Sequence, residues 1–127
     1  MSKPVGPYTP IVAVGPWLLT SGQVGLAGGA VVDGGFEPQF RQALANLQAV
    51  LATEGATLDD VVKTTVFLTD MDDYGEMNRI YTEVFEGHRP ARSAVAVAAL
   101  PVGALVEIEA MAWHVGHVGG YTSDEEE

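Results

Sequence analysis

Two runs of alternating side chains near the C-terminal end constrain the fold most, because alternation with a period of two is the pattern of a β-strand. The first run spans residues 92–98 and places Arg92 on the same face as a row of alanines. The second run spans residues 106–113 and places Glu107 and Glu109 together on one face. A Leu-Pro-Val-Gly segment lies between them, where proline lacks the N–H group that a ladder needs and glycine permits a turn. The stretch therefore predicts two strands separated by a sharp break.

These strands allow two interpretations. In the first, the alanines let a neighbouring element pack closely, and both glutamates simply face water. In the second, the alanines leave space in which Arg92 holds a small carboxylate with its forked donors, and a carboxylate on another strand acts as a base. A tight hairpin would leave Arg92 and Glu107 about five residues out of register, on the order of 16 Å, which is too far for one small ligand. A joint site would then need another strand order or a second subunit.

Six motifs follow one another in a fixed order along most of the chain. They are Gly6-Pro7-Tyr8, Thr20-Ser21-Gly22-Gln23, Val62-Lys63-Thr64-Thr65-Val66-Phe67-Leu68, Met77-Asn78-x-x-Tyr81, Pro90-Ala91-Arg92-Ser93-x-Val95 and Val106-Glu107-Ile108-Glu109. Together they run from about Gly6 to Trp113 and resemble the RidA family, also called YjgF and, in older descriptions, L-PSP endoribonuclease.

The resemblance implies a fold, an assembly and an activity. The fold is α+β, a two-layer chorismate-mutase-like arrangement with a mixed sheet of about six strands and two helices packed on one face. The assembly is a homotrimer with its sites between subunits. The activity is that of a 2-iminobutanoate/2-iminopropanoate deaminase, which hydrolyses reactive 2-aminoacrylate-type intermediates to 2-oxo acids and ammonia. The family's chemistry requires no metal and no organic cofactor.

The resemblance also implies roles for particular residues. Arg92 would bind the substrate carboxylate, Glu107 would activate a water as the catalytic base, and Tyr8 would orient the water or the substrate. The remaining substrate-binding positions would be Ser21, Gly22, Asn78 and Ala94. Many members of the family carry cysteine where this chain has Ala94, so a thiol-dependent role does not transfer to this chain.

Local patterns predict the order of the other elements. Apolar residues at helical spacing predict a helix over residues 36–54, and β-branched residues predict a strand over residues 61–68. A second helix is expected after residues 70–73, where Asp73 and Glu76 fit a capping box. The order of strands and helices around one sheet indicates a two-layer α+β or α/β domain with both helices on one face.

Length and charge limit the domain organisation and the partners. The 127 residues suit one domain, which we assign to residues 1–116, followed by an acidic, disordered tail over residues 117–127. The formal net charge is −11, so we expect no nucleic-acid partner. No apolar run approaches the length of a membrane span, so we expect a soluble, cytoplasmic protein without a membrane partner. The absence of cysteine excludes disulfides and thiolate catalysis.

Other function classes stay open at this level. The main alternative to the deaminase is a non-catalytic regulatory module that binds small 2-oxo acids. A ribonuclease role is suggested by the older family name, but the acidic balance argues against it. A holdase chaperone is the fourth candidate, and its activity would not depend on Arg92 or Glu107.

Overall fold

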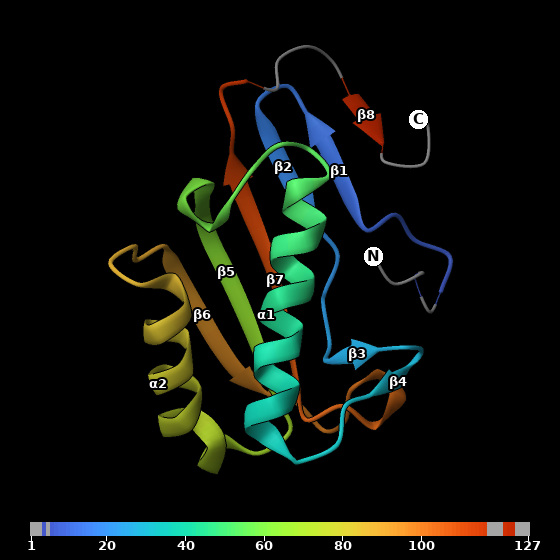
Figure 1. The fold of residues 1–127 in the computed structure, drawn as a ribbon, viewed down its shortest axis with the longest axis vertical. Helices are drawn as coiled ribbons and strands as arrows, with labels where there is room; N and C mark the ends of the chain where they lie inside the picture. The colour runs from blue at the N-terminus through green and yellow to red at the C-terminus, as the bar shows by residue number, and fades with distance from the viewer. Residues whose placement is uncertain (1–3, 5, 117–120, 124–127) are drawn as a thin grey trace.

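A computed structural model describes residues 4, 6–116 and 121–123 of the chain. The elements predicted from the sequence follow in the predicted order, and three short 3₁₀ turns and a last strand at residues 121–123 are added to them (Figure 1). The strands and helices are β1 (Ile11–Val14), β2 (Trp17–Thr20), β3 (Leu26–Ala27), β4 (Ala30–Val31), α1 (Phe36–Ala52), β5 (Val61–Leu68), α2 (Tyr74–Phe85), β6 (Ala91–Ala96), β7 (Val106–Trp113) and β8 (Tyr121–Ser123). The 3₁₀ turns are Leu58–Asp60, Met71–Asp73 and Pro101–Gly103.

The described strands form one six-stranded mixed sheet in the order β6-β5-β7-β2-β1-β8, and β3 and β4 form a separate two-stranded sheet. Strands β5 and β6 run parallel, joined by α2, and the other neighbouring pairs of the large sheet are antiparallel. Both helices pack on the same face of this sheet (Figure 1). The predicted two-layer α+β architecture is therefore confirmed.

The two strands of the Arg92 and Glu107 motifs are not neighbours. Strand β5 lies between β6 and β7 and pairs with both. The tight hairpin considered from the sequence therefore does not form. Strands β6 and β7 are connected instead through β5, a central strand whose β-branched residues suit a buried position.

Helix α1 covers the middle of the sheet and is held to it by one apolar face. Its fully buried side chains include Phe40, Leu44, Leu47 and Leu51, which meet inner strands of the sheet. The helix ends at Ala52, two residues before the predicted end. The backbone N–H of Thr53 turns back to the carbonyl of Val50, and Gly55 follows with a left-handed φ of 79°.

The predicted capping box of α2 is wrong. The Asp73 side chain makes no capping hydrogen bond at the start of this helix. A capping box forms instead across the first 3₁₀ turn, where the Thr57 side chain accepts from the backbone and the Asp60 carboxylate accepts from the Thr57 N–H at 3.0 Å. Thr57 and Asp60 have the same spacing as Asp73 and Glu76, so spacing alone does not tell which pair forms the box.

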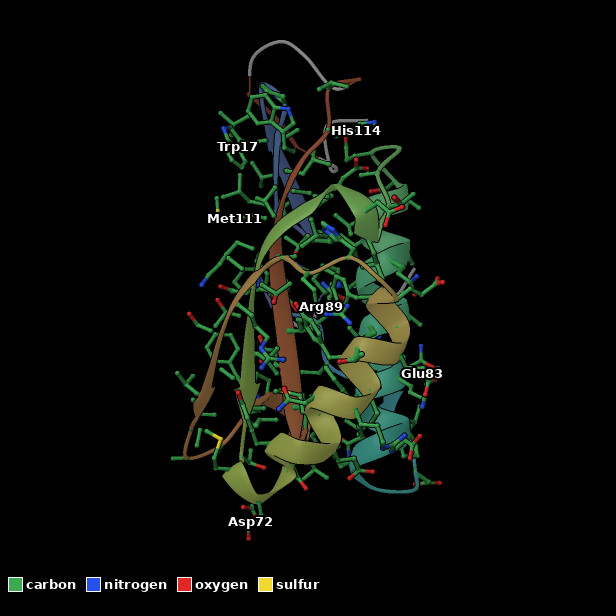
Figure 2. All side chains as sticks on the ribbon, turned by 90° about the vertical axis from the view of Figure 1, so that its left-hand side faces the viewer. Trp17, Asp72, Glu83, Arg89, Met111 and His114 are labelled. Atoms are coloured by element: carbon green, nitrogen blue, oxygen red, sulfur yellow. The ribbon has the colours of Figure 1, made fainter. Side chains whose placement is uncertain are left out.

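The other face of the sheet carries large apolar side chains that are partly exposed. No helix of the described residues covers this face, and Figure 2 shows Trp17 and Met111 on the side away from both helices. The rings of Trp17 and Trp113 meet edge to face, with centroids 5.0 Å apart. The exposed apolar residues at this end of the open face are Val14, Trp17, Leu19, Met111 and Trp113, which we call the open-face patch.

Only part of the predicted acidic tail is described. Residues 121–123 form β8, which pairs antiparallel with β1 at the edge of the sheet. Residues 117–120 and 124–127 lie outside the described residues. Within the described part of the chain, neither helix is long and apolar enough to cross a lipid bilayer.

Candidate functional site

A pocket of about 270 Å³ opens beside the start of β7. It brings together four of the seven site residues predicted from the sequence. They come from three places: the N-terminal segment, the corner that follows β2, and strand β7. Two further lining residues were missed, although both lie close to predicted motifs. The lining residues are Tyr8, Ser21, Gly22, Val24, Pro101 and Glu107.

The closest approach in this pocket is between Glu107 and Gly22. A Cβ atom on Gly22 would overlap the Glu107 Oε2 atom and would lie only 2.6 Å from its Cδ atom. The backbone beside Gly22 is fixed to β7, because Gln23 and Ile108 exchange two N–H···O bonds of 2.7 and 3.0 Å. The missing side chain of Gly22 therefore lets the carboxylate of Glu107 lie directly over the main chain.

The Glu107 carboxyl is in an environment that favours its protonated form. Burial first, and the charge of Glu109 second, raise the pKa of the Glu107 carboxyl above its usual range. No hydrogen bond from another described residue offsets these two effects. A carboxylate of raised pKa that no donor of the described residues engages suits the role of a general base.

Ser21 and Tyr8 also line the pocket. The Ser21 hydroxyl donates to the Thr9 carbonyl at 2.6 Å, and the Ser21 N–H donates to the Pro10 carbonyl at 2.9 Å. Because its hydroxyl proton is already used, Ser21 can offer a ligand an acceptor oxygen rather than a donor. Tyr8 lies at the rim with 39% of its surface exposed.

Helix α1 is bonded to the segments on either side of the pocket, at Val24 and just before β7, which the sequence did not indicate. The Asn46 side-chain amide donates to the carbonyls of Val24 and Leu26, each at 3.0 Å. The Gln39 side-chain oxygen accepts from the Leu105 N–H at 2.9 Å, just before β7 begins. The sequence singles out neither amide, because their partners are distant along the chain.

Arg92 lies outside this pocket, on the helix-covered side of β6. It pairs in register with Thr64, which is fully buried toward the helices. Its Nη2 atom donates to the Tyr74 hydroxyl at 3.2 Å, and its Cζ atom lies 4.9 Å from the centre of the Tyr81 ring. The Tyr81 hydroxyl is in turn 2.8 Å from the Thr64 hydroxyl. Two tyrosines of α2 therefore hold the guanidinium in place.

No carboxylate of the described residues pairs with Arg92, whereas Arg41 and Arg79 each form ion pairs with glutamates. An arginine whose remaining N–H groups are not engaged by a protein anion is suited to bind an external one. The environment of Arg92 is thus consistent with the carboxylate-binding role that the sequence predicts.

Arg92 and Glu107 do not meet within one chain. Glu107 pairs with Phe67 of β5, which pairs with Val95 of β6, so Arg92 is three residues out of register. Two strand spacings amount to about 10 Å and three residues along a strand to about 10 Å. The two side chains also point to opposite faces, since Arg92 faces α2 and Glu107 faces the open side.

The last two predicted residues lie with Arg92 rather than with Glu107. Ala94 pairs with the buried Val66 and packs against the core, so its side chain faces the helices. Asn78 lies on α2, one turn after Tyr74, and is half-buried. Neither lines the Glu107 pocket.

Among the described residues, no group of three or more histidines, aspartates or glutamates is arranged to hold a metal ion.

The fold and these residues define a small α+β protein with a carboxylate pocket on one side of its sheet and an arginine held by tyrosines on the other. The chain belongs to the family described as Endoribonuclease L-PSP, whose family model matches residues 1–114. This confirms the RidA resemblance.

Individual relatives agree with this assignment. The mouse protein named 2-iminobutanoate/2-iminopropanoate deaminase is 49% identical over 110 residues, which are 85% of this chain and 82% of that protein. The crystal structure of RidA from a Psychrobacter species is 38% identical, with a TM-score of 0.85 over 87% of this chain and 91% of the other. The crystal structure of E. coli TdcF with bound serine is 35% identical, with a TM-score of 0.82 over 87% of this chain and 91% of the other.

Proposed function

We propose that this protein is an enamine/imine deaminase that hydrolyses 2-aminoacrylate and related 2-imino acids to 2-oxo acids and ammonia. The observation that carries the proposal is the half-buried Glu107 carboxylate, which lies over Gly22 without a hydrogen bond from a described residue and has a raised pKa. Such a group can take a proton from water and return it within one reaction cycle. The name of the mouse relative supports the same reaction.

The reaction needs an anchored carboxylate and a positioned water. Arg92 binds the substrate carboxylate by paired charge-assisted hydrogen bonds, which fixes the neighbouring imine carbon. 2-Aminoacrylate reacts as its 2-imino tautomer, protonated on nitrogen. Glu107 takes one proton from a water as its oxygen attacks the imine carbon, and a neutral carbinolamine forms. Glu107 returns that proton to the amino nitrogen, the carbon–nitrogen bond breaks, and ammonia leaves. The carbinol hydroxyl then loses its proton to Glu107 or solvent as the carbonyl of the 2-oxo acid forms. Tyr8 at the rim orients the water or the substrate.

The site requires more than one copy of the chain in this proposal. Arg92 and Glu107 face opposite sides of the sheet, so Arg92 of one protomer would meet Glu107 of the next in a homotrimer with sites between subunits. The open-face patch supports such an assembly, because monomers rarely expose contiguous large apolar surfaces. The bound serine of TdcF supports a small ligand of the 2-imino acid type, since serine also carries nitrogen on the carbon next to its carboxylate.

The test is the release of ammonia and 2-oxo acid from freshly generated 2-aminoacrylate. We expect the wild type to accelerate hydrolysis above the spontaneous rate, and the Arg92→Ala and Glu107→Gln variants to lose this acceleration. Loss of a positioned acid-base group alone typically costs ~10²–10⁴-fold. A folded wild type that leaves the spontaneous rate unchanged would refute the deaminase.

A regulatory module that binds 2-oxo acids without turnover is the second candidate. The complex of TdcF with serine favours it, because it records a small amino acid bound by a protein of this fold. Tight binding of 2-oxobutanoate without any ammonia release would support it. A ribonuclease is disfavoured by the net charge and because Arg41 and Arg79, two of the six basic residues, are already paired with glutamates.

A further inference from the structure

Tyr74, at the start of α2, presents its hydroxyl group to the carboxylate anchor. The Arg92 Nη2 atom donates to this phenol oxygen at 3.2 Å, and the Arg92 Cζ atom lies 5.6 Å from the centre of the ring. Tyr74 is 41% exposed. Its oxygen accepts from the guanidinium, and its own O–H proton finds no acceptor among the residues that the structure describes.

The second tyrosine beside Arg92 is used differently. Tyr81 is only 4% exposed, and its hydroxyl is bonded to the buried Thr64 hydroxyl. Its ring therefore supports the guanidinium from the core side, while Tyr74 contacts it from the solvent side. An anion that approaches the exposed N–H groups of Arg92 arrives next to the Tyr74 hydroxyl and not next to that of Tyr81.

A carboxylate has room for more donors than the arginine fork supplies. Its two oxygens offer about four lone-pair sites, of which a bidentate arginine fills two. A phenol that accepts a hydrogen bond from a cation is polarised and becomes a stronger donor through its own O–H. The Tyr74 hydroxyl is thus placed and polarised to donate to the anion that Arg92 holds.

We propose that Tyr74 is a substrate-binding residue whose hydroxyl donates a third hydrogen bond to the carboxylate held by Arg92. This inference rests on the proposed function, because it assumes that Arg92 is the carboxylate anchor. The consequence is selectivity: a 2-oxo or 2-imino acid gains the bond from Tyr74, whereas the matching amide or ester, which lacks the negative charge, gains little from it.

The test compares Tyr74→Phe with the wild type, because phenylalanine keeps the ring over Arg92 and removes only the hydroxyl. Calorimetric titration with 2-oxobutanoate should show roughly tenfold weaker binding, the size expected for a lost hydrogen bond to a charged group. Titration with 2-oxobutanamide should show little change between the two proteins. In turnover of 2-aminoacrylate, the loss should fall mainly on KM. The matched control is Thr82→Val, which removes an exposed hydroxyl elsewhere on α2 and should bind like the wild type.

The outcomes separate this inference from the proposed function. If Arg92→Ala abolishes 2-oxobutanoate binding and Tyr74→Phe binds as tightly as the wild type, the role of Tyr74 is refuted and the anchor survives. If Arg92→Ala also binds like the wild type, the anchor itself is wrong, and both proposals fail. A loss in Tyr74→Phe that is equal for the acid and the amide would show a packing role and would likewise overturn the inference.

Discussion

The Glu107 pocket and the Arg92 anchor are built in opposite ways. Glu107 lies on an inner strand and faces the open side, where its carboxylate lies against the main chain of Gly22. Arg92 lies on the edge strand β6 and faces the helices, where two tyrosine side chains hold it. The pocket is thus formed by close approach of the backbone, and the anchor by side chains. In the proposed function these are two half-sites, which one chain cannot itself join.

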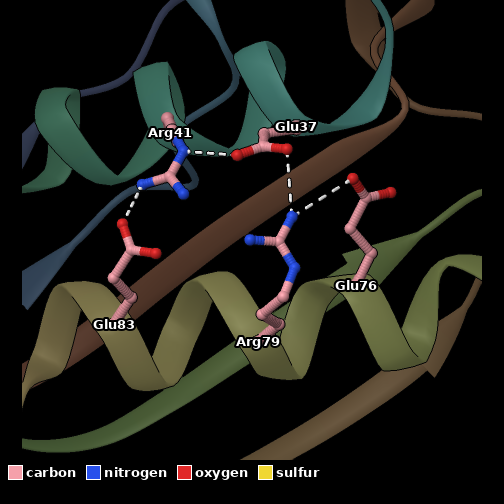
Figure 3. A network of polar contacts seen from close by, with 5 residues as sticks. All are labelled: Glu37, Arg41, Glu76, Arg79 and Glu83. Carbon is pink, nitrogen blue, oxygen red and sulfur yellow. Dashed lines mark hydrogen bonds and ion pairs between the residues drawn. The ribbon is translucent and has the colours of Figure 1, made fainter.

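Each half-site is supported by a different helix. Helix α1 bonds through Asn46 to Val24 in the Glu107 pocket and through Gln39 to the residue before β7, while α2 supplies the tyrosines around Arg92. The two helices are linked by a surface network of ion pairs, which Figure 3 shows from close by. Its members are Glu37, Arg41, Glu76, Arg79 and Glu83. The following predictions test how independent the two half-sites are.

The largest effect is expected for Gly22→Ala. The new Cβ atom would overlap the Glu107 carboxylate, so the base must move from its place. Displacing it should lower the deaminase rate by ~10²–10⁴-fold, the usual contribution of such a group. Steady-state kinetics on 2-aminoacrylate measure this loss. Gly87→Ala is the control, because a Cβ atom there meets nothing within 4 Å. Wild-type activity in a folded Gly22→Ala protein would mean that the close contact is irrelevant to catalysis.

Mixing two inactive variants should restore activity if the half-sites come from different protomers. Arg92→Ala retains Glu107, and Glu107→Gln retains Arg92. After subunit exchange at equal amounts, about a quarter of the sites between copies would combine an intact arginine with an intact glutamate. Activity measured before and after exchange should rise from background to about a quarter of the wild-type value. No recovery, despite mass-spectrometric proof of mixed oligomers, would place both residues of a site in one chain.

A smaller effect is expected from Glu109→Gln. The charge of Glu109 is the second cause of the raised pKa of the Glu107 carboxyl, after burial. The base must be ionised to act, so activity falls as the pH drops through this raised pKa. Removing the Glu109 charge lowers the Glu107 pKa, and the acid limb of kcat/KM should therefore move to lower pH while staying above the usual carboxylate range. An unmoved limb would show that burial alone sets the pKa.

The smallest effect is expected for Arg79→Ala in the network between the helices. Arg79 bonds to Glu37 at 3.0 Å and lies 3.6 Å from Glu76, but these side chains are substantially exposed. Exposed pairs contribute little to stability and are screened by salt. Thermal unfolding should show a small loss of stability that shrinks at high salt. A large, salt-independent loss would mean that the link between the two helices is more than a surface contact.

The sequence predicts where the strands and helices of this fold lie along the chain better than it predicts which strands pair with one another. Strand β5 was predicted with the bounds that the structure has, because its β-branched pattern is local. Its position between β6 and β7 depends on pairing between distant segments, which no local pattern encodes. The relative placement of Arg92 and Glu107 depends on that strand order, so the local sequence patterns did not predict it either.

The candidate site was predicted in part for the same reason. Tyr8, Ser21, Gly22 and Glu107 were found through motifs, and the structure brings them together in one pocket. Gln39 and Asn46 were missed, because an amide on a helix looks the same in the sequence whether it meets water or a distant carbonyl. The trimer, the catalytic roles and the cytoplasmic location stay predictions.

The contact between Gly22 and Glu107 also decides the order in which this pocket can be remodelled. A side chain at position 22 has no room while a glutamate stands at position 107, whereas a shorter residue at position 107 would free that space. In a directed-evolution experiment, a substitution at position 22 should therefore cost less stability once position 107 carries a shorter residue. Changes at the two positions are thus expected to occur as a pair.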